Sequence, residues 1–207
     1  MNRLSSLFSP NKLNNVIDNR PVAILLPGPS IAEFINRKNE FINFDWCWAS
    51  MNKYWVIEKE WPLDIAIITC PDTCSEYKDK IDTFSGLLIT DQKGFNNSYF
   101  YSRKGDINLN TLFIFLLLLA EKGVKNIFLF GADGAALENH HYFSEEYPAA
   151  DYALESLSNQ TDYLNKNFPD VSCSIINCSI DSHYTRFKKV SYDKLLSTVL
   201  SGETYNS

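Results

Sequence analysis

The sequence lacks the features that mark membrane, nucleic-acid-binding or repetitive proteins. Its most apolar stretch, Leu112 to Ala120, is about half the length that a helix needs to cross a bilayer, and is expected to be a buried core helix. Lys and Arg number 19 against 25 Asp and Glu, so the formal charge is −6 and no basic stripe is present. Nucleic-acid binding, which needs clustered cations to neutralise phosphates, is therefore not expected. The chain also contains no internal repeat and no low-complexity linker.

Signatures of metal and disulfide chemistry are equally scarce. The five cysteines are odd in number and share no short repeated spacing with histidine, which argues against a zinc site and favours free thiols in a reducing compartment. Cys70 and Cys74 could instead form a redox pair. Residues 1–19 have no continuous apolar core, so no secretory signal is expected. We expect a cytoplasmic protein, and association with the inner face of the membrane stays open.

What the chain does have is an ordinary globular composition and a heavy aromatic load. Hydrophobic residues make up 45% and charged residues 21% of the 207 residues, which predicts a single folded domain. The 4 Trp, 11 Tyr and 14 Phe could serve a large core, a ring-stacking pocket or a sticky surface. We expect an N-terminal arm over 1–20, one Rossmann-like nucleotide-binding domain over 21–200 and a C-terminal tail over 201–207.

Short apolar runs recur along the domain with helical or irregular segments between them. This α/β alternation predicts a mostly parallel sheet flanked by helices. The expected strands are 22–26, 46–49, 64–68, 86–89, 126–130 and 171–176. Two helices are expected from local signals: one from Ser30 to about Arg37, begun by a capping box of Ser30 and Glu33, and one over 108–122, ended by Gly123.

In a doubly wound sheet the ligand lies beyond the carboxyl ends of the strands, so the loops that leave those ends are the candidate site. Three such loops are 27–30, 50–53 and 131–134, and the helix that begins near residue 110 adds polar residues. Gly-Pro-Ser before a helix could bind an anion, although the GxGxxG and GxxxxGK[ST] patterns are both absent. The alternative is that these small polar residues only cap helices and stabilise turns. The candidates are Gly28, Ser30, Asn52, Asn110, Thr111, Gly131 and Asp133.

The sequence has three histidines, and two of them follow the third loop. His140 and His141 would lie above the crevice, where a general acid or base must stand, or they form an exposed surface pair. His183 lies farther along the chain. No further Cys, His or carboxylate has a recognised ligand spacing to these residues, so we expect no metal site.

Taken as a set, the motifs resemble a known superfamily. A strand, Gly-Pro-Ser, a strand followed by Asn, an Asn/Thr-led apolar helix, a strand with Gly-x-Asp and a final Asn-Cys-Ser turn resemble the bacterial sialyltransferases of glycosyltransferase family 42. They are equally similar to the MptE-like group, which includes archaeal 6-hydroxymethylpterin diphosphokinases and bacterial proteins found near surface-glycan genes. The resemblance covers about Pro21 to Leu196.

The resemblance implies roles for individual residues. Gly28 and Ser30 would hold the phosphate and ribose region, Asn52 would contact the nucleotide, and Gly131 and Asp133 would lie beside the nucleoside. The start of the long helix would contribute Asn110 and Thr111, and a lid after the Gly-x-Asp turn would supply His140 or His141 as general base. Tyr142 and Tyr147 correspond loosely to tyrosines that steady the departing phosphate. The family's first loop has an additional Asn that this chain lacks, and its lid is longer.

Three functions follow as alternatives. The first is a metal-independent glycosyltransferase of surface-glycan synthesis that uses a CMP-linked acidic sugar and a glycan acceptor; the chain contains no DxD motif. The second is a diphosphokinase that uses ATP and Mg²⁺, with Asp133 and Asp72 as ligands. The third is a non-catalytic protein that keeps the fold. Peripheral membrane association and oligomerisation stay open in each case.

Overall fold

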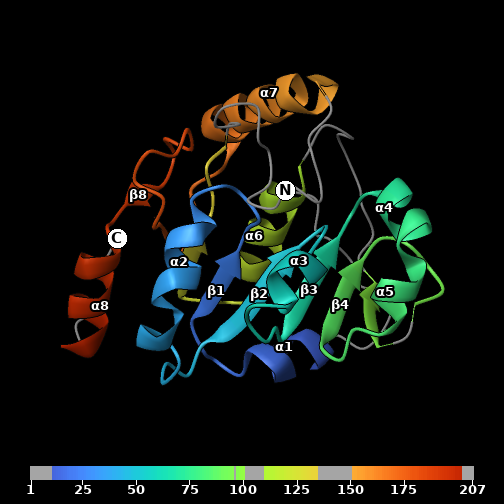
Figure 1. Ribbon diagram of the computed structural model, residues 1–207, viewed down its shortest axis with the longest axis horizontal. Coiled ribbons are helices and arrows are strands. Elements are labelled where there is room, and N and C mark those ends of the chain that lie inside the picture. The colour runs from blue at the N-terminus through green and yellow to red at the C-terminus, as the bar shows by residue number, and fades with distance from the viewer. Residues whose placement is uncertain (1–10, 96, 101–109, 135–150, 202–207) are drawn as a thin grey trace.

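The computed structural model describes residues 11–95, 97–100, 110–134 and 151–201, and its centre is one eight-stranded sheet (Figure 1). The order of the strands across the sheet is β5-β4-β3-β2-β1-β6-β7-β8, and every neighbouring pair is parallel. The predicted α/β fold with a parallel sheet is confirmed. The strands are β1 (Val22–Leu25), β2 (Cys47–Met51), β3 (Ile65–Ile68), β4 (Leu87–Thr90), β5 (Ser98–Phe100), β6 (Asn126–Phe130), β7 (Ser174–Asn177) and β8 (Lys188–Lys189).

Helices cover both faces of the sheet. They are α1 (Asn11–Ile17), α2 (Ile31–Arg37), the 3-10 turn η1 (Lys38–Glu40), α3 (Trp55–Glu58), α4 (Pro71–Glu76), α5 (Lys78–Asp82), α6 (Thr111–Glu121), α7 (Asp151–Asn167) and α8 (Tyr192–Leu200). Alternate residues of β1 face opposite layers: Val22 and Ile24 pack with α1, α6 and α7, whereas Ala23 and Leu25 pack with α2, α3 and α8. The result is a three-layer molecule with the sheet in the middle.

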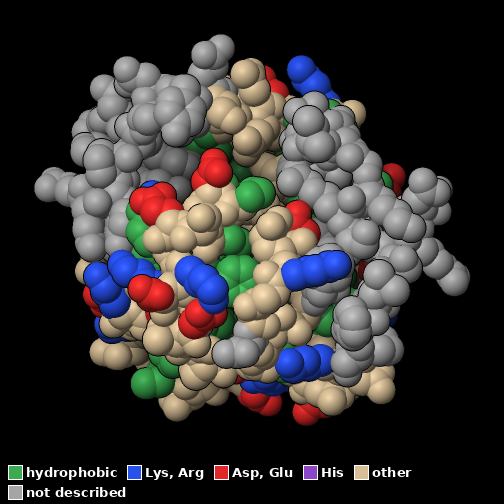
Figure 2. Space-filling model, turned by 90° about the vertical axis from the view of Figure 1, so that its right-hand side faces the viewer, with side chains coloured by type: hydrophobic (Ala, Val, Ile, Leu, Met, Phe, Trp, Pro, Cys, Tyr) green, Lys and Arg blue, Asp and Glu red, His purple; other side chains and the backbone are tan. Residues whose placement is uncertain are grey.

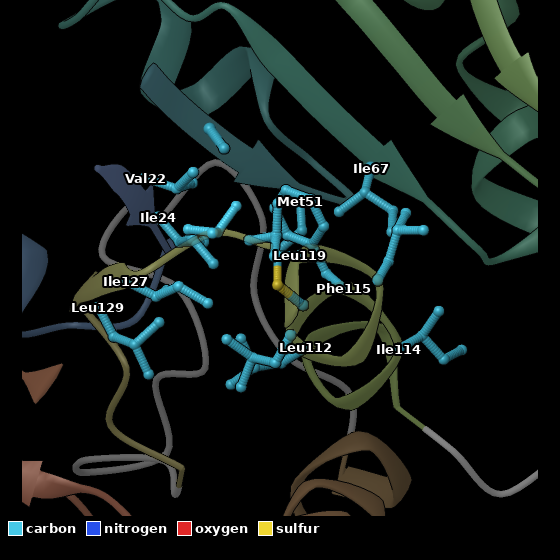
Figure 3. Close-up of a cluster of buried hydrophobic side chains, with 14 of the residues drawn as sticks. Val22, Ile24, Met51, Ile67, Leu112, Ile114, Phe115, Leu119, Ile127 and Leu129 are labelled. Atoms are coloured by element: carbon cyan, nitrogen blue, oxygen red, sulfur yellow. The ribbon is translucent and has the colours of Figure 1, made fainter. Parts of the chain in front are cut away.

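The apolar stretch that the sequence assigns to the core is indeed buried as α6. Figure 3 shows Leu112, Phe115 and Leu119 of this helix directed at sheet residues that include Ile24 and Met51. On its other side, the ring of Phe113 lies 5.2 Å from that of Phe168, just beyond α7. A helix covered on both sides needs no polar face, which explains its uniform hydrophobicity. Among the described residues, no helix combines the length and apolarity needed to cross a membrane.

The opposite face of the sheet carries a large aromatic cluster. The ring of Phe34 in α2 lies 5.1 to 5.7 Å, between centroids, from each of four other rings. These rings belong to Phe41, Trp48, Trp61 and Phe130. Of the uses that composition left open for the aromatic residues, a core is the one that this cluster serves. It also fastens α2, and therefore the loop before it, to the sheet.

The structure differs from the sequence prediction mainly at the two edges of the sheet. Strands β5 and β8 were not expected, because three and two residues cannot produce a recognisable apolar run. Lys188 and Lys189 of β8 are both exposed, and lysines on so short an edge strand disfavour pairing with another chain. Figure 2 views the side that carries β4, α4 and α5, where acidic and basic side chains are interspersed rather than separated by sign.

The cysteines are free, as predicted, and differ sharply in burial. Cys47, Cys74, Cys173 and Cys178 are buried, and Cys70 is partly exposed. Burial raises the pKa of each of the four buried thiols, that of Cys47 to about 12, so they remain protonated near neutral pH.

We therefore expect a thiol reagent at pH 8 to modify one cysteine of the native protein within minutes and all five in denaturant. Counting modified thiols by mass spectrometry tests this result. The variant Cys70→Ser should lose the rapid reaction, and rapid modification of a second thiol in that variant would contradict the assignment.

Candidate functional site

A cavity of about 120 Å³ lies at the carboxyl ends of the central strands. From β1 the chain builds the sheet outward through β2 to β5, and then returns to add β6 on the other side of β1. The strand order thus reverses between β1 and β6, which is where parallel α/β sheets bind ligands. The loops after β1, β2 and β6, the start of α6, and α7 all contribute to the lining. Predicted site residues in this lining are Gly28, Asn52, Asn110, Thr111, Gly131 and Asp133.

Two of the predicted glycines allow the loops after β1 and β6 to touch through their backbones. A Cβ on Gly131 would lie 2.1 Å from the carbonyl oxygen of Leu26, and the φ of Gly131 is +69°. A Cβ on Gly28 would lie 2.4 Å from the carbonyl oxygen of Gly131. Both distances are far below contact, so these positions need glycine for the packing of the two loops against each other.

The carboxylate of Asp133 is buried and joins these loops. Its Oδ2 accepts a hydrogen bond of 2.9 Å from the backbone N–H of Ser30, immediately before α2. A carboxylate at this place accepts a hydrogen bond from a backbone N–H that the helix leaves unpaired. Its negative charge also interacts favourably with the positive N-terminal end of α2. No other described residue donates a hydrogen bond to the carboxylate.

Ser30 does not act as the sequence predicted. Its side chain makes no capping bond to α2, and its backbone is helical rather than extended. The capping-box prediction is wrong because its hydroxyl instead forms a 2.8 Å hydrogen bond with the hydroxyl of Ser179. Among the described residues Ser30 is not part of the cavity lining. Ser30 therefore stabilises the loop after β1 from outside the cavity.

The Asn-Cys-Ser turn after β7 fixes the Gly-x-Asp loop. Ser179 Oγ accepts a 3.0 Å hydrogen bond from the N–H of Ala132, and Asn177 Nδ2 donates to the carbonyl oxygen of Ala132 at 3.2 Å. Ser182 Oγ donates to the same oxygen. These contacts explain why the turn accompanies the loop in the sequence: it positions the peptide that carries Asp133.

The side chains of Thr69, Thr111 and Asn52 form a chain of hydrogen bonds where the loop after β2 meets the start of α6. Thr111 Oγ donates to Asn52 Oδ1 at 3.3 Å, which leaves Thr69 as the donor in its 2.6 Å bond with Thr111. Asn52 has a φ of +51°, a conformation that Asn tolerates better than most residues. With its oxygen held by Thr111, the amide N–H groups of Asn52 have no acceptor among the described residues and can donate to a ligand.

Asn110 and Tyr184 also line the cavity. Asn110 is the N-cap of α6, since its side chain accepts a 2.7 Å bond from the N–H of Phe113, as the capping alternative predicted. Tyr184 was not predicted, because no motif surrounds it. Burial raises the pKa of Tyr184, and contacts with Thr161 and Asn110 oppose this shift. Its hydroxyl therefore remains protonated at neutral pH.

The predicted catalytic residues lie outside the described part of the chain. His140 and His141, together with Tyr142 and Tyr147, belong to residues 135–150, as does the expected lid. His183 is described: its side chain is exposed, and its backbone N–H donates a 2.7 Å bond to the carbonyl oxygen of Asp133. It therefore lies against the same loop that carries the site aspartate.

The charges around the cavity are sparse. Asp133 is the one charged side chain in the described lining, which includes no Lys or Arg. Asp72, the second ligand suggested for magnesium, is exposed in the first turn of α4 and does not belong to that lining. Within the described ranges, no three His, Cys, Asp or Glu side chains are grouped so as to hold a metal. Magnesium could still be held by one carboxylate and ligand phosphates.

Comparison with known proteins adds no relative to this picture: no family model matches the chain, and neither curated proteins nor solved structures contain a significant match.

Proposed function

We propose that this protein is a glycosyltransferase-like enzyme of surface-glycan synthesis that binds a CMP-linked acidic sugar in the cavity between β1, β2 and β6. The observation that carries the proposal is convergence: polar residues from four segments far apart in the sequence meet at the switch point of the sheet. Structural capping explains Asn110, but it does not explain the amide of Asn52 or the second oxygen of Asp133.

The charge of the lining disfavours a nucleotide with several phosphates. A triphosphate needs several cations or a metal to offset its charge. The described lining offers none: its one charged side chain is the carboxylate of Asp133, and the amide of Asn52 supplies a neutral donor. Such a lining disfavours the three phosphates of ATP more than the single phosphate of a CMP-sugar.

The proposed transfer involves a simple exchange of bonds. The oxygen of an acceptor hydroxyl attacks the anomeric carbon of the sugar, the bond from that carbon to the phosphate oxygen breaks, and CMP leaves with the electron pair. The hydroxyl proton passes to His140 or His141 as general base. Neutral hydrogen-bond donors stabilise the departing phosphate, so the reaction needs no metal.

The first test is a thermal-shift screen with CMP, CDP, UDP, GDP, ADP and ATP, each with and without Mg²⁺. At a hundredfold excess over Kd, CMP should stabilise the protein by about 2.7 kcal/mol, or about 5–10 °C in Tm, independently of Mg²⁺. A shift with ATP that requires Mg²⁺ would favour the diphosphokinase. No shift with any nucleotide would overturn both enzymatic functions and favour the non-catalytic alternative.

The variant Asn52→Asp tests the site itself. It keeps the size of the side chain and the tolerance for positive φ, but it replaces the amide donors with a negative charge. We expect the affinity for CMP, measured by calorimetry, to fall about tenfold or more.

The matched control is Asn19→Asp, because Asn19 is exposed, also has a positive φ of 60° and is not in the cavity lining. Its affinity for CMP should equal that of the native protein. Equal affinities in both variants would remove Asn52 from the proposed site.

A further inference from the structure

A second concave surface lies beside the cavity, between α7 and the segment that joins β7 to β8. This groove has a volume of about 560 Å³, and every side chain in its described lining is polar. Five of its residues come from α7: Ser158, Thr161, Asp162, Asn165 and Lys166. Gly134 lines both the groove and the cavity, so the two are separated by a single residue.

The walls of the groove are fixed by hydrogen bonds to the backbone. Asn165 Nδ2 donates to the carbonyl oxygen of His183 at 2.9 Å, and its Oδ1 accepts from the N–H of Thr185 at 2.9 Å. Thr161 Oγ donates to the carbonyl oxygen of Gly134 at 2.7 Å. Helix α7 and the β7–β8 segment are therefore held together, and the groove is formed before any ligand arrives.

The remaining polar side chains of the groove are exposed to solvent. They make no hydrogen bond or ion pair with another described residue, and comprise Ser158, Asp162, Lys166, Asp181, His183 and Thr185. Donors and acceptors are thus both present around a hollow that no hydrophobic residue lines, which suits a ligand with many hydroxyl groups. Two carboxylates against one ammonium favour a neutral ligand over an anionic one.

We propose that this groove binds a neutral saccharide, which serves as the acceptor of the transferase proposed above; the acceptor role, though not the binding, rests on that function. A saccharide here would lie next to the nucleotide cavity across Gly134. His183 would contact it, because His183 lines the groove and its backbone N–H is hydrogen-bonded to the Asp133 carbonyl oxygen at the same boundary. The groove would therefore deliver a hydroxyl group to the edge of the donor site.

The test is an NMR titration of the ¹⁵N-labelled full chain with lactose and, separately, with 3′-sialyllactose. Lactose should shift the backbone amides of Asp162, Lys166 and His183, and should bind more tightly than the anionic sialyllactose. Asp162→Ala should weaken lactose binding about tenfold, since a hydrogen bond to a charged group is lost. Asp79→Ala, which removes an exposed carboxylate from α5, should leave it unchanged.

A parallel CMP titration separates this proposal from the proposed function. Lactose binding in the groove without CMP binding would support the saccharide site and overturn the nucleotide-dependent function. CMP binding without lactose shifts in the groove would do the reverse. Tighter binding of sialyllactose, or equal lactose affinity in Asp162→Ala and Asp79→Ala, would overturn the saccharide proposal.

Discussion

We expect Gly131→Ala to lower the free energy of unfolding by about 3 kcal/mol or more, because backbone strain and a forced loop displacement add together. The φ of +69° disfavours alanine by itself. In addition, the new Cβ would lie 2.1 Å from the backbone oxygen of Leu26, which cannot move without shifting the end of β1. Denaturant unfolding followed by circular dichroism measures the loss.

Gly123→Ala separates the two contributions. Gly123 ends α6 with a comparable φ of +81°, but nothing lies within 4 Å of its added Cβ. This variant should lose only about 1 kcal/mol, the cost of the backbone conformation. Equal losses in the two variants would show that the loops after β1 and β6 are not in close contact.

The second large effect is expected for Phe34→Ala, which should cost about 3–5 kcal/mol. Phe34 is 1% exposed and its ring contacts four other aromatic rings. Removing it leaves a cavity beneath α2 that rigid neighbouring rings cannot fill. The emission of the adjacent Trp48 and Trp61 should shift to longer wavelength as water enters, which gives a second readout besides denaturant unfolding.

Phe44→Ala is the matched control for this deletion. The ring of Phe44 also contacts two aromatic neighbours, Phe41 and Trp46, but Phe44 is only half-buried. Its loss should cost about 1–2 kcal/mol, because part of the deleted surface was already in water. Equal losses in Phe44→Ala and Phe34→Ala would contradict the deeper burial of Phe34.

The sequence predicted the centre of the fold and missed its margins. Strands β1, β3 and β6 are short apolar runs buried on both faces, and this burial leaves a direct trace in composition. Strand β8 consists of two exposed lysines, whose extended conformation is imposed by pairing with β7. A pairing between distant segments leaves no local pattern in the sequence, so the edge strands of the sheet could not be predicted from the sequence.

The site was predictable by position more than by role. Asn52, Thr111 and Asp133 could be expected in one crevice because the carboxyl ends of parallel strands meet at one edge. The partner of Ser30 could not, since Ser179 lies 149 residues away in the sequence and no local pattern links the two hydroxyls. Tyr184 escaped notice for the same reason, being brought to the cavity by the β7–β8 segment.

The position of β1 at the middle of the sheet has a consequence for synthesis on the ribosome. One edge of this strand pairs with β2, which follows closely, but its other edge waits for β6, with Leu25 opposite Phe130. At a translation rate of about 5–20 residues per second, roughly 5–20 s pass between the synthesis of Leu25 and that of Phe130. Until then, the innermost strand of the finished protein is an open edge strand of the nascent chain, available to any neighbouring polypeptide.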